Sequence, residues 1–205
     1  SIAVTKMQSP SFTPKLPPDL LLQAYRVGVF PMAPNKDSTE VQWFEPHFRG
    51  IIPLDGFKIS KNVRRAIRNI QHEVRYDSSF EQVMRACAKR DKTWISEVLV
   101  KAYTRLHRAE HAHSVEIWQE GELVGGLYGV TLGSVFFGES MFQIKPEMHK
   151  FALYYCHQRL LERGFMLWDT QFYTEHLGRF GAIEIPQIEY LELLDVALRR
   201  HAVFD

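Results

Sequence analysis

The sequence predicts an α+β fold, because helical and strand patterns occupy separate stretches of the chain. Apolar residues recur at helical spacing through residues 60–106 and with a period of two through residues 114–142. Residues 28–56 instead hold many prolines and glycines, which break regular structure. We therefore predict a small N-terminal domain over residues 1–56 and a larger domain over residues 57–205, with a mixed, mostly antiparallel sheet flanked by helices.

The N-terminal elements are expected to be short. Residues 1–18 are polar and proline-rich and lack the apolar centre of a signal peptide, so they predict an extended arm. Residues 20–26 predict a helix that ends near Gly28, followed by short strands and loops up to Gly56.

Three helices are expected next, beginning at Ser60, near Ser78 and at Ser96. Ser60 and Ser96 are predicted N-caps, and Ser78 with Glu81 forms the pattern of a capping box. The predicted buried faces are Val63, Ile67 and Ile70, then Phe80, Val83, Met84 and Cys87, then Leu99, Tyr103 and Leu106.

The strands of the larger domain follow. A hairpin is predicted from residues 114–119 and 123–130 around the turn Glu120-Gly121, and a further strand over residues 135–142. The remaining predictions are a helix from Pro146 to Arg163 closed by Gly164, strands over residues 165–169 and 182–185, and a helix over residues 188–201.

Composition limits the function classes. The 205 residues carry a formal net charge of only +1, so any RNA site must be a local basic patch. The two cysteines, Cys87 and Cys156, form no disulfide framework, which favours a reducing, intracellular compartment. No segment approaches the roughly 18 apolar residues of a membrane span. We expect a cytoplasmic monomer without a membrane partner.

The most informative stretch is a pair of neighbouring strands around residues 123–130 and 134–142. Glycines interrupt both apolar runs, and glycine in a strand lets a ligand or another backbone approach closely. One carboxylate, Glu139, lies in the second run, and a buried carboxylate is costly unless something pairs with it. The pattern predicts a pocket with hydrophobic walls and one negative charge.

Motifs in a defined order carry a family resemblance. They are Tyr25-Arg26-Val27-Gly28-Val29-Phe30-Pro31-Met32, Trp94-Ile95, Ala102-Tyr103, Leu106-His107, Ala112-His113-Ser114-Val115-Glu116, Leu123-Val124-Gly125-Gly126-Leu127-Tyr128-Gly129, Phe137-Gly138-Glu139-Ser140-Met141-Phe142, Asp169-Thr170-Gln171, His176-Leu177, Gly181-Ala182 and Ile185-Pro186. Over residues 20–195 this order resembles the leucyl/phenylalanyl-tRNA–protein transferase family.

The resemblance implies an enzyme with the GNAT-type acyltransferase fold. Such an enzyme moves leucine or phenylalanine from aminoacyl-tRNA to the α-amino group of proteins that begin with arginine or lysine. This ester aminolysis marks the acceptor proteins for degradation by the N-end rule. The resemblance implies no metal and no organic cofactor.

The resemblance also implies which residues bind the donor side chain. It assigns Trp94, Phe136 and the pair Trp43-Phe44 to an apolar pocket, with Ser140 and Met141 beside it. Such a pocket excludes polar aminoacyl groups by their desolvation cost. It separates aliphatic groups that differ by a methylene by only about 1–3 kcal/mol. Leucine, phenylalanine and methionine are therefore the expected donors.

Three polar residues are candidates for the chemistry. Asp169 and Gln171 lie two residues apart on a predicted strand and so share one face, a spacing that alone favours a structural hydrogen-bonded pair. The resemblance makes them the catalytic pair, with the Gln171 carbonyl accepting an amine proton and Asp169 polarising the amide. The resemblance assigns Glu139 to the positive N-terminal residue of the acceptor.

A basic helix face is the candidate tRNA contact. Lys61, Arg64, Arg65 and Arg68 lie opposite the apolar residues of their helix. Considered alone, such a face is typical of a solvated helix. The resemblance makes it a cradle for phosphates of the tRNA acceptor stem.

Two other functions remain as alternatives: a GNAT acyltransferase that uses acyl-CoA, and a non-catalytic module that binds tRNA or protein N-termini. The segment 142–150 has no glycine, which argues against a pyrophosphate-binding turn. His111, His113 and Glu116 predict no metal site, because HxH without a clear third ligand is weak evidence. Donor and acceptor preference depend on departures from the family pattern at Phe44, Glu45, Gln143, Ile144 and Gln187.

Overall fold

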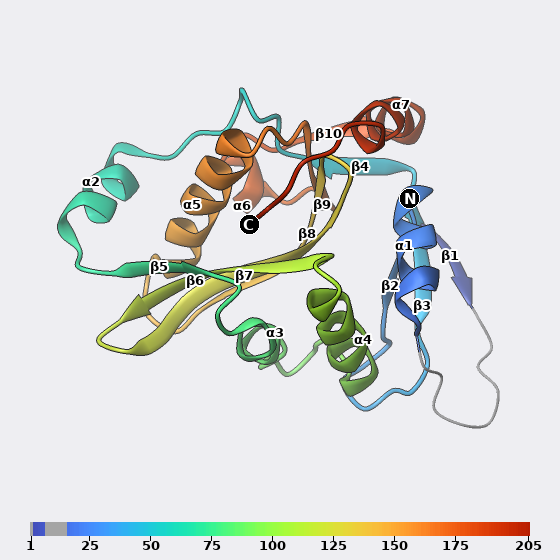
Figure 1. The fold of residues 1–205 in the computed structure, drawn as a ribbon, viewed down its shortest axis with the longest axis horizontal. Coiled ribbons are helices and arrows are strands. Elements are labelled where there is room, and N and C mark those ends of the chain that lie inside the picture. The colour runs from blue at the N-terminus through green and yellow to red at the C-terminus, as the bar shows by residue number, and fades with distance from the viewer. Residues whose placement is uncertain (1, 7–15) are drawn as a thin grey trace.

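The structure is a computed structural model that describes residues 2–6 and 16–205. Much of the predicted N-terminal arm, residues 7–15, lies outside the described part. Its beginning forms β1 (Ile2–Lys6), which pairs antiparallel with β3 (Gln42–Pro46). With β2 (Phe30–Met32) they build a small sheet in the order β1-β3-β2, against which α1 (Pro18–Arg26) lies (Figure 1).

A seven-stranded sheet forms the centre of the molecule, in the order β10-β4-β9-β8-β7-β6-β5. Only β8 and β9 run parallel, and every other neighbouring pair is antiparallel. The strands are β4 (Phe48–Ile51), β5 (Glu73–Tyr76), β6 (Ala112–Gln119), β7 (Glu122–Leu132), β8 (Val135–Gln143), β9 (Leu167–Gln171) and β10 (Ile183–Pro186).

Helices cover both faces of this sheet (Figure 1). One hydrophobic cluster joins α1, α3, α4 and α7 to the face that carries Phe137. The other joins α5 to the face that carries Phe136, as strand alternation predicts. The helices of the larger part are α2 (Lys61–Asn69), α3 (Phe80–Cys87), α4 (Glu97–Arg108), α5 (Met148–Glu162), α6 (Glu175–Gly178) and α7 (Gln187–Leu198).

The predicted N-caps of two helices are confirmed. Ser60 accepts a hydrogen bond from the backbone N–H of Val63, and Ser96 accepts one from Leu99. The predicted capping box of Ser78 and Glu81 is wrong, because the Ser78 hydroxyl donates to Glu116 instead. Ile70 was predicted on the buried face of α2 but is 40% exposed, because the helix ends one residue earlier.

The division of the chain into two domains at Gly56 stays a prediction. β4 precedes that residue, yet it pairs with both β9 and β10 in the large sheet. Within the described residues, no helix is long and apolar enough to cross a membrane.

Candidate active site

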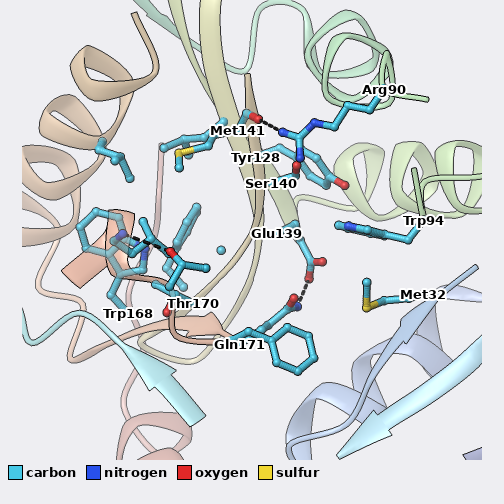
Figure 2. Close-up of a pocket in the computed structure, with 17 residues that line it drawn as sticks. Met32, Arg90, Trp94, Tyr128, Glu139, Ser140, Met141, Trp168, Thr170 and Gln171 are labelled. Carbon is cyan, nitrogen blue, oxygen red and sulfur yellow. Dashed lines mark hydrogen bonds between the residues drawn. The ribbon is translucent and has the colours of Figure 1, made fainter. Parts of the chain in front are cut away.

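A cavity of about 270 Å³ lies between β8 and β9 (Figure 2). The two strands are paired only from Val135 opposite Leu167 to Phe137 opposite Asp169. Beyond these residues each strand pairs only with its other neighbour, so the sheet opens between them. The cavity therefore occupies a gap in the middle of the sheet.

The cavity has apolar walls with a few polar groups. Trp94, Phe136, Ser140 and Met141 are predicted site residues that line it. Further apolar walls come from Met32, Leu127, Leu153, Trp168, Phe172 and Leu177. The polar groups come from Arg90, Tyr128, Glu139, Thr170, Gln171 and Thr174.

Glu139 reaches the cavity because β8 bulges at this residue. Opposite β7, Gly138 pairs with Gly129 and Ser140 pairs with Tyr128, which leaves Glu139 as the extra residue. Bulges redirect side chains and are frequent beside active sites. The glycines are required here, because a Cβ on Gly129 would lie 2.5 Å from the Phe137 carbonyl oxygen.

The Glu139 carboxyl group is buried but only partly satisfied. Its Oε1 accepts hydrogen bonds from the Tyr25 hydroxyl and from Nε2 of Gln171, the latter at 3.0 Å. Its Oε2 has no hydrogen-bond partner within the described residues. Burial raises the pKa of Glu139 to about 7, against the opposing effect of the bonds from Tyr25 and Gln171. The group therefore changes charge near neutral pH.

Two buried tyrosines form a hydrogen-bond chain that ends at Glu139. The Tyr25 hydroxyl lies 2.6 Å from the Tyr103 hydroxyl. Because an ionised Glu139 can only accept, Tyr25 donates to Glu139 and Tyr103 donates to Tyr25. Burial, and then the nearby Glu139 charge, raise the pKa of Tyr25, so its proton stays in place.

Asp169 does not line the cavity, although it was predicted to take part in the chemistry. Its carboxylate forms a bidentate pair with Arg49, with Nε–Oδ1 at 3.0 Å and Nη2–Oδ2 at 2.6 Å. It also accepts from the Tyr190 hydroxyl at 2.8 Å and the backbone N–H of Gln171 at 2.7 Å. The Asp169 carboxylate is buried and already accepts four hydrogen bonds, so it has no free acceptor position for a substrate. Its role in the structure is to hold Arg49, Tyr190 and the backbone of Gln171 in place.

Gln171 is held at two points. Its backbone N–H is bound by Asp169, and its φ of 65° puts it in the left-handed region at the end of β9. Its side-chain amide donates to Glu139, not to Asp169 as the sequence suggested. Within the described residues, the amide carbonyl oxygen of Gln171 accepts no hydrogen bond. Gln171 thus offers an acceptor beside a carboxylate.

The other predicted substrate residues lie elsewhere. Trp43 and Phe44 belong to β3 and do not line this cavity. Phe44 packs edge-on against Phe172, which does line it, at a centroid distance of 6.4 Å. Their contact with a donor side chain stays a prediction. Lys61, Arg64, Arg65 and Arg68 are all exposed on α2.

Sequence reasoning missed Arg49, the partner of Asp169. It is 2% exposed, and its Nη1 donates to the carbonyl oxygen of Gly28 at 2.6 Å. Its guanidinium lies over the rings of Phe30 and Tyr190, at 4.8 and 4.4 Å. The only signal was a single arginine in the short apolar run that became β4.

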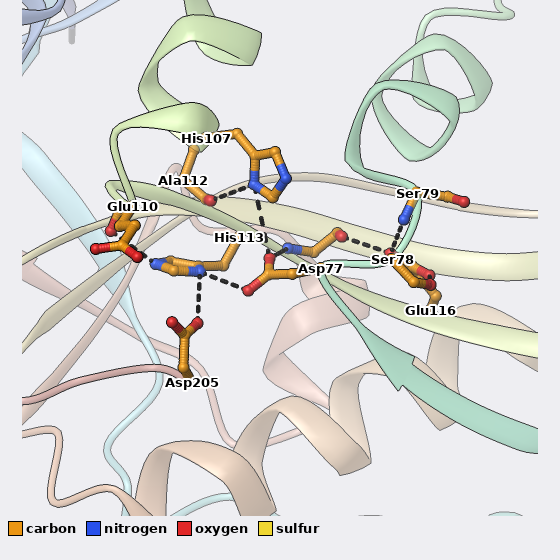
Figure 3. Close-up of polar contacts among 10 residues, drawn as sticks. Asp77, Ser78, Ser79, His107, Glu110, Ala112, His113, Glu116 and Asp205 are labelled. Carbon is orange, nitrogen blue, oxygen red and sulfur yellow. Dashed lines mark hydrogen bonds and ion pairs between the residues drawn. The ribbon is translucent and has the colours of Figure 1, made fainter.

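The histidine cluster away from the cavity has a structural explanation (Figure 3). Asp77, His113 and Asp205 bring possible metal-ligating atoms within 4.8 Å of one another. However, Nδ1 of His113 faces Asp77 at 2.8 Å, and its Nε2 faces the Glu110 carbonyl oxygen at 3.1 Å. Both ring nitrogens of His113 therefore already lie within hydrogen-bonding distance of protein oxygens, so the contacts of this cluster are accounted for without a cation.

Two family models and several solved structures match this chain. The family model "Leucyl/phenylalanyl-tRNA protein transferase" matches residues 51–195, and that of its N-terminal domain matches residues 15–47. The solved structure of FemX is 13% identical with a TM-score of 0.53, covering 83% of this chain and 67% of that one. L-PGS from Bacillus licheniformis is 12% identical with a TM-score of 0.48, covering 75% of this chain and 66% of that one.

The chain thus spans about two thirds of the length of these solved proteins. The likeness to FemX concerns the fold alone. The predicted α+β fold, with a mixed, mostly antiparallel sheet flanked by helices, is confirmed.

Proposed function

Because the chain belongs to the leucyl/phenylalanyl-tRNA protein transferase family, and is thus an aminoacyltransferase, we propose that its cavity holds the aminoacyl group of a charged tRNA for transfer to a protein. The observation that carries this proposal is the gap between β8 and β9, where an apolar wall adjoins Glu139 and Gln171. The donor's leucine or phenylalanine side chain occupies the apolar wall. An acceptor's α-amino group approaches from the polar side.

The reaction is aminolysis of an ester, and it needs little acid–base assistance. A peptide α-amino group has a pKa of about 7.7–8.0, so part of it is neutral near pH 7. Gln171 orients the amine by accepting one N–H with its free carbonyl oxygen. The proton that the amine loses as the C–N bond forms passes to the ester oxygen, which leaves as the tRNA hydroxyl.

Acceptors that begin with arginine or lysine fit the charge of this site. The unpartnered Oε2 of Glu139 can accept a charge-assisted hydrogen bond from a guanidinium or ammonium group. The expected setting is the N-end rule of protein degradation, in the cytoplasm, with the enzyme acting as a monomer.

The test of the function is transfer of a radiolabelled amino acid from a mixed aminoacyl-tRNA pool to peptides that differ only at the first residue. Labelling with leucine and phenylalanine, and only of peptides with N-terminal arginine or lysine, supports the proposal. Transfer from acyl-CoA in the absence of tRNA would favour the alternative acyltransferase instead. Tight tRNA binding without any transfer would favour a binding module.

Glu139→Gln should selectively weaken basic acceptors. Loss of one charged hydrogen bond costs about 1.5–3 kcal/mol, so KM for an arginine-initiated peptide should rise roughly 10- to 100-fold at pH 8. In the wild type, this KM should fall as pH rises through about 7, because Glu139 becomes charged there. The variant should lose this dependence. The same pH profile in Glu139→Gln would contradict the assignment.

Charge reversal on α2 should weaken donor binding. Arg64→Glu combined with Arg68→Glu removes two contacts with phosphate, so KM for aminoacyl-tRNA should rise by tenfold or more and its dependence on salt should become shallower. Arg199→Glu at the C-cap of α7 is the control for charge reversal elsewhere on the surface, since α7 lies far from α2 (Figure 1). Arg199 is paired with Asp195, so a stability measurement accompanies this control. If the double variant behaves like the control, α2 is only a solvated surface.

A further inference from the structure

A second, smaller cavity lies beside α6. Its volume is about 90 Å³, and Ser60, Val63, Lys150, His176, Arg179 and Phe180 line it. This volume holds about three water molecules, the space of one tetrahedral anion and less than a nucleoside. The α6 segment takes part in both cavities, because Thr174 and Leu177 line the larger one while His176 and Arg179 line this one.

The lining of this smaller cavity is strongly basic. Arg179 is exposed, and its guanidinium has no hydrogen-bond or ion-pair partner within the described part of the chain. Lys150 is paired with Glu147, at 3.0 Å. Burial, and then the charges of Lys150 and Arg179, lower the pKa of His176. Lys150 and Arg179 are therefore close enough to His176 to attract an anion together.

The histidine itself is held in place by a neighbour. Nε2 of His176 lies 2.7 Å from Nε2 of His149, so the two rings share one proton. Burial, and then the proximity of His176, lower the pKa of His149 to about 4. His149 therefore stays neutral and accepts from His176. An anion in the cavity would favour the doubly protonated form of His176, which donates from both nitrogens.

The third side of the cavity is the start of α2. Ser60 caps this helix, and its first turn contains no acidic residue. A helix N-terminus adds a positive electrostatic potential to that of Lys150 and Arg179. The exposed basic face of α2 begins at the same end, with Lys61.

We propose that this smaller cavity binds one backbone phosphate of the tRNA acceptor end, between the basic face of α2 and the aminoacyl cavity. The inference rests on the proposed function. This phosphate contact adds a defined binding point to the general electrostatic attraction between the basic face of α2 and the tRNA. The terminal nucleotides then lie across α6 and bring the ester to Glu139 and Gln171.

Single phosphate replacement tests this contact. The donors are leucyl-CCA trinucleotide, the same trinucleotide with a neutral methylphosphonate at one linkage at a time, and leucyl-adenosine without phosphate. In the wild type, one methylphosphonate should raise KM about tenfold. Arg179→Gln should raise KM for the unmodified trinucleotide by a similar factor. For the methylphosphonate donor whose KM is raised in the wild type, Arg179→Gln should raise KM no further. For leucyl-adenosine, which has no phosphate, Arg179→Gln should leave KM unchanged.

Two variants and one spectroscopic measurement complete the design. Lys150→Gln should reproduce Arg179→Gln, whereas Arg199→Gln at the C-cap of α7 should match the wild type. Inorganic phosphate should raise the pKa of His176, followed by NMR, in the wild type and much less in Arg179→Gln.

If Arg179→Gln changes KM equally for all three kinds of donor, or changes it for none of them, the proposal is overturned. So would a phosphate-induced shift of His176 without any effect of methylphosphonate, because that outcome describes an anion site unrelated to tRNA. Failure of the wild type to transfer leucine from any tRNA-derived donor would instead count against the proposed function. The His176 measurement still decides whether the cavity binds an anion.

Discussion

Replacing Arg49 with methionine should lower the free energy of unfolding by about 3–5 kcal/mol. The change leaves Asp169 with no exposure and without its charge partner. The Tyr190 hydroxyl and the Gln171 backbone N–H remain, but two neutral donors do not compensate a buried charge. Equilibrium denaturation in urea at pH 7 measures the loss.

Arg85→Met is the matched control for that measurement. Arg85 also forms a bidentate pair with a carboxylate, that of Glu97, but both side chains are about half exposed. An exposed pair contributes about 0.2–1 kcal/mol. The double variant Arg49→Met with Asp169→Leu removes the stranded charge and should recover part of the loss. If Arg49→Met costs no more than Arg85→Met, the buried pair does not hold the site together.

Replacing Gln171 with alanine should lower kcat for transfer about 100-fold, with KM for charged tRNA unchanged. The side-chain amide is the group that offers a free carbonyl oxygen next to Glu139, whereas the apolar wall that holds the donor side chain comes from other residues. Single-turnover transfer from saturating leucyl-tRNA measures the chemical step separately from binding.

Backbone strain must be separated from the loss of the amide, because Gln171 has a φ of 65°. Gln171→Gly adopts this conformation freely, so it should show the same loss of kcat as alanine. Thr170→Val removes an unpartnered hydroxyl from the same cavity and should keep near wild-type kcat. Activity restored in Gln171→Gly would show that conformation, and not the amide, determines the rate.

Much of the structure after Gly56 could be predicted from sequence because its elements have a clear period and local signals. The hairpin of β6 and β7 turns at Glu120 and Gly121, both with positive φ. α4 begins at a serine cap and buries its expected face. The local capping pattern at Ser78 gave a wrong prediction. The Ser78 hydroxyl instead donates to the carboxylate of Glu116, which lies in the sequence-distant strand β6.

The short strands could not be predicted because their pairing depends on distant partners. β4 has four residues, and its neighbours β9 and β10 come from the far end of the sequence. Motifs placed Glu139 and Gln171 in one site, but not the bond between them, which needs the bulge in β8. The pairing of Arg49 with Asp169 could not be predicted for the same reason, since nothing near Arg49 in sequence indicates a buried carboxylate.

The position of β4 in the large sheet also has a consequence for biosynthesis. Ile51 pairs with Asp169 on one side and with Ile183 on the other. Contacts between residues so far apart in sequence slow folding, since a large loop must close before they form. On the ribosome, β4 emerges early and waits with both edges unpaired until β9 and β10 have been made. Newly made chains therefore hold residues 48–51 without their sheet partners for most of translation.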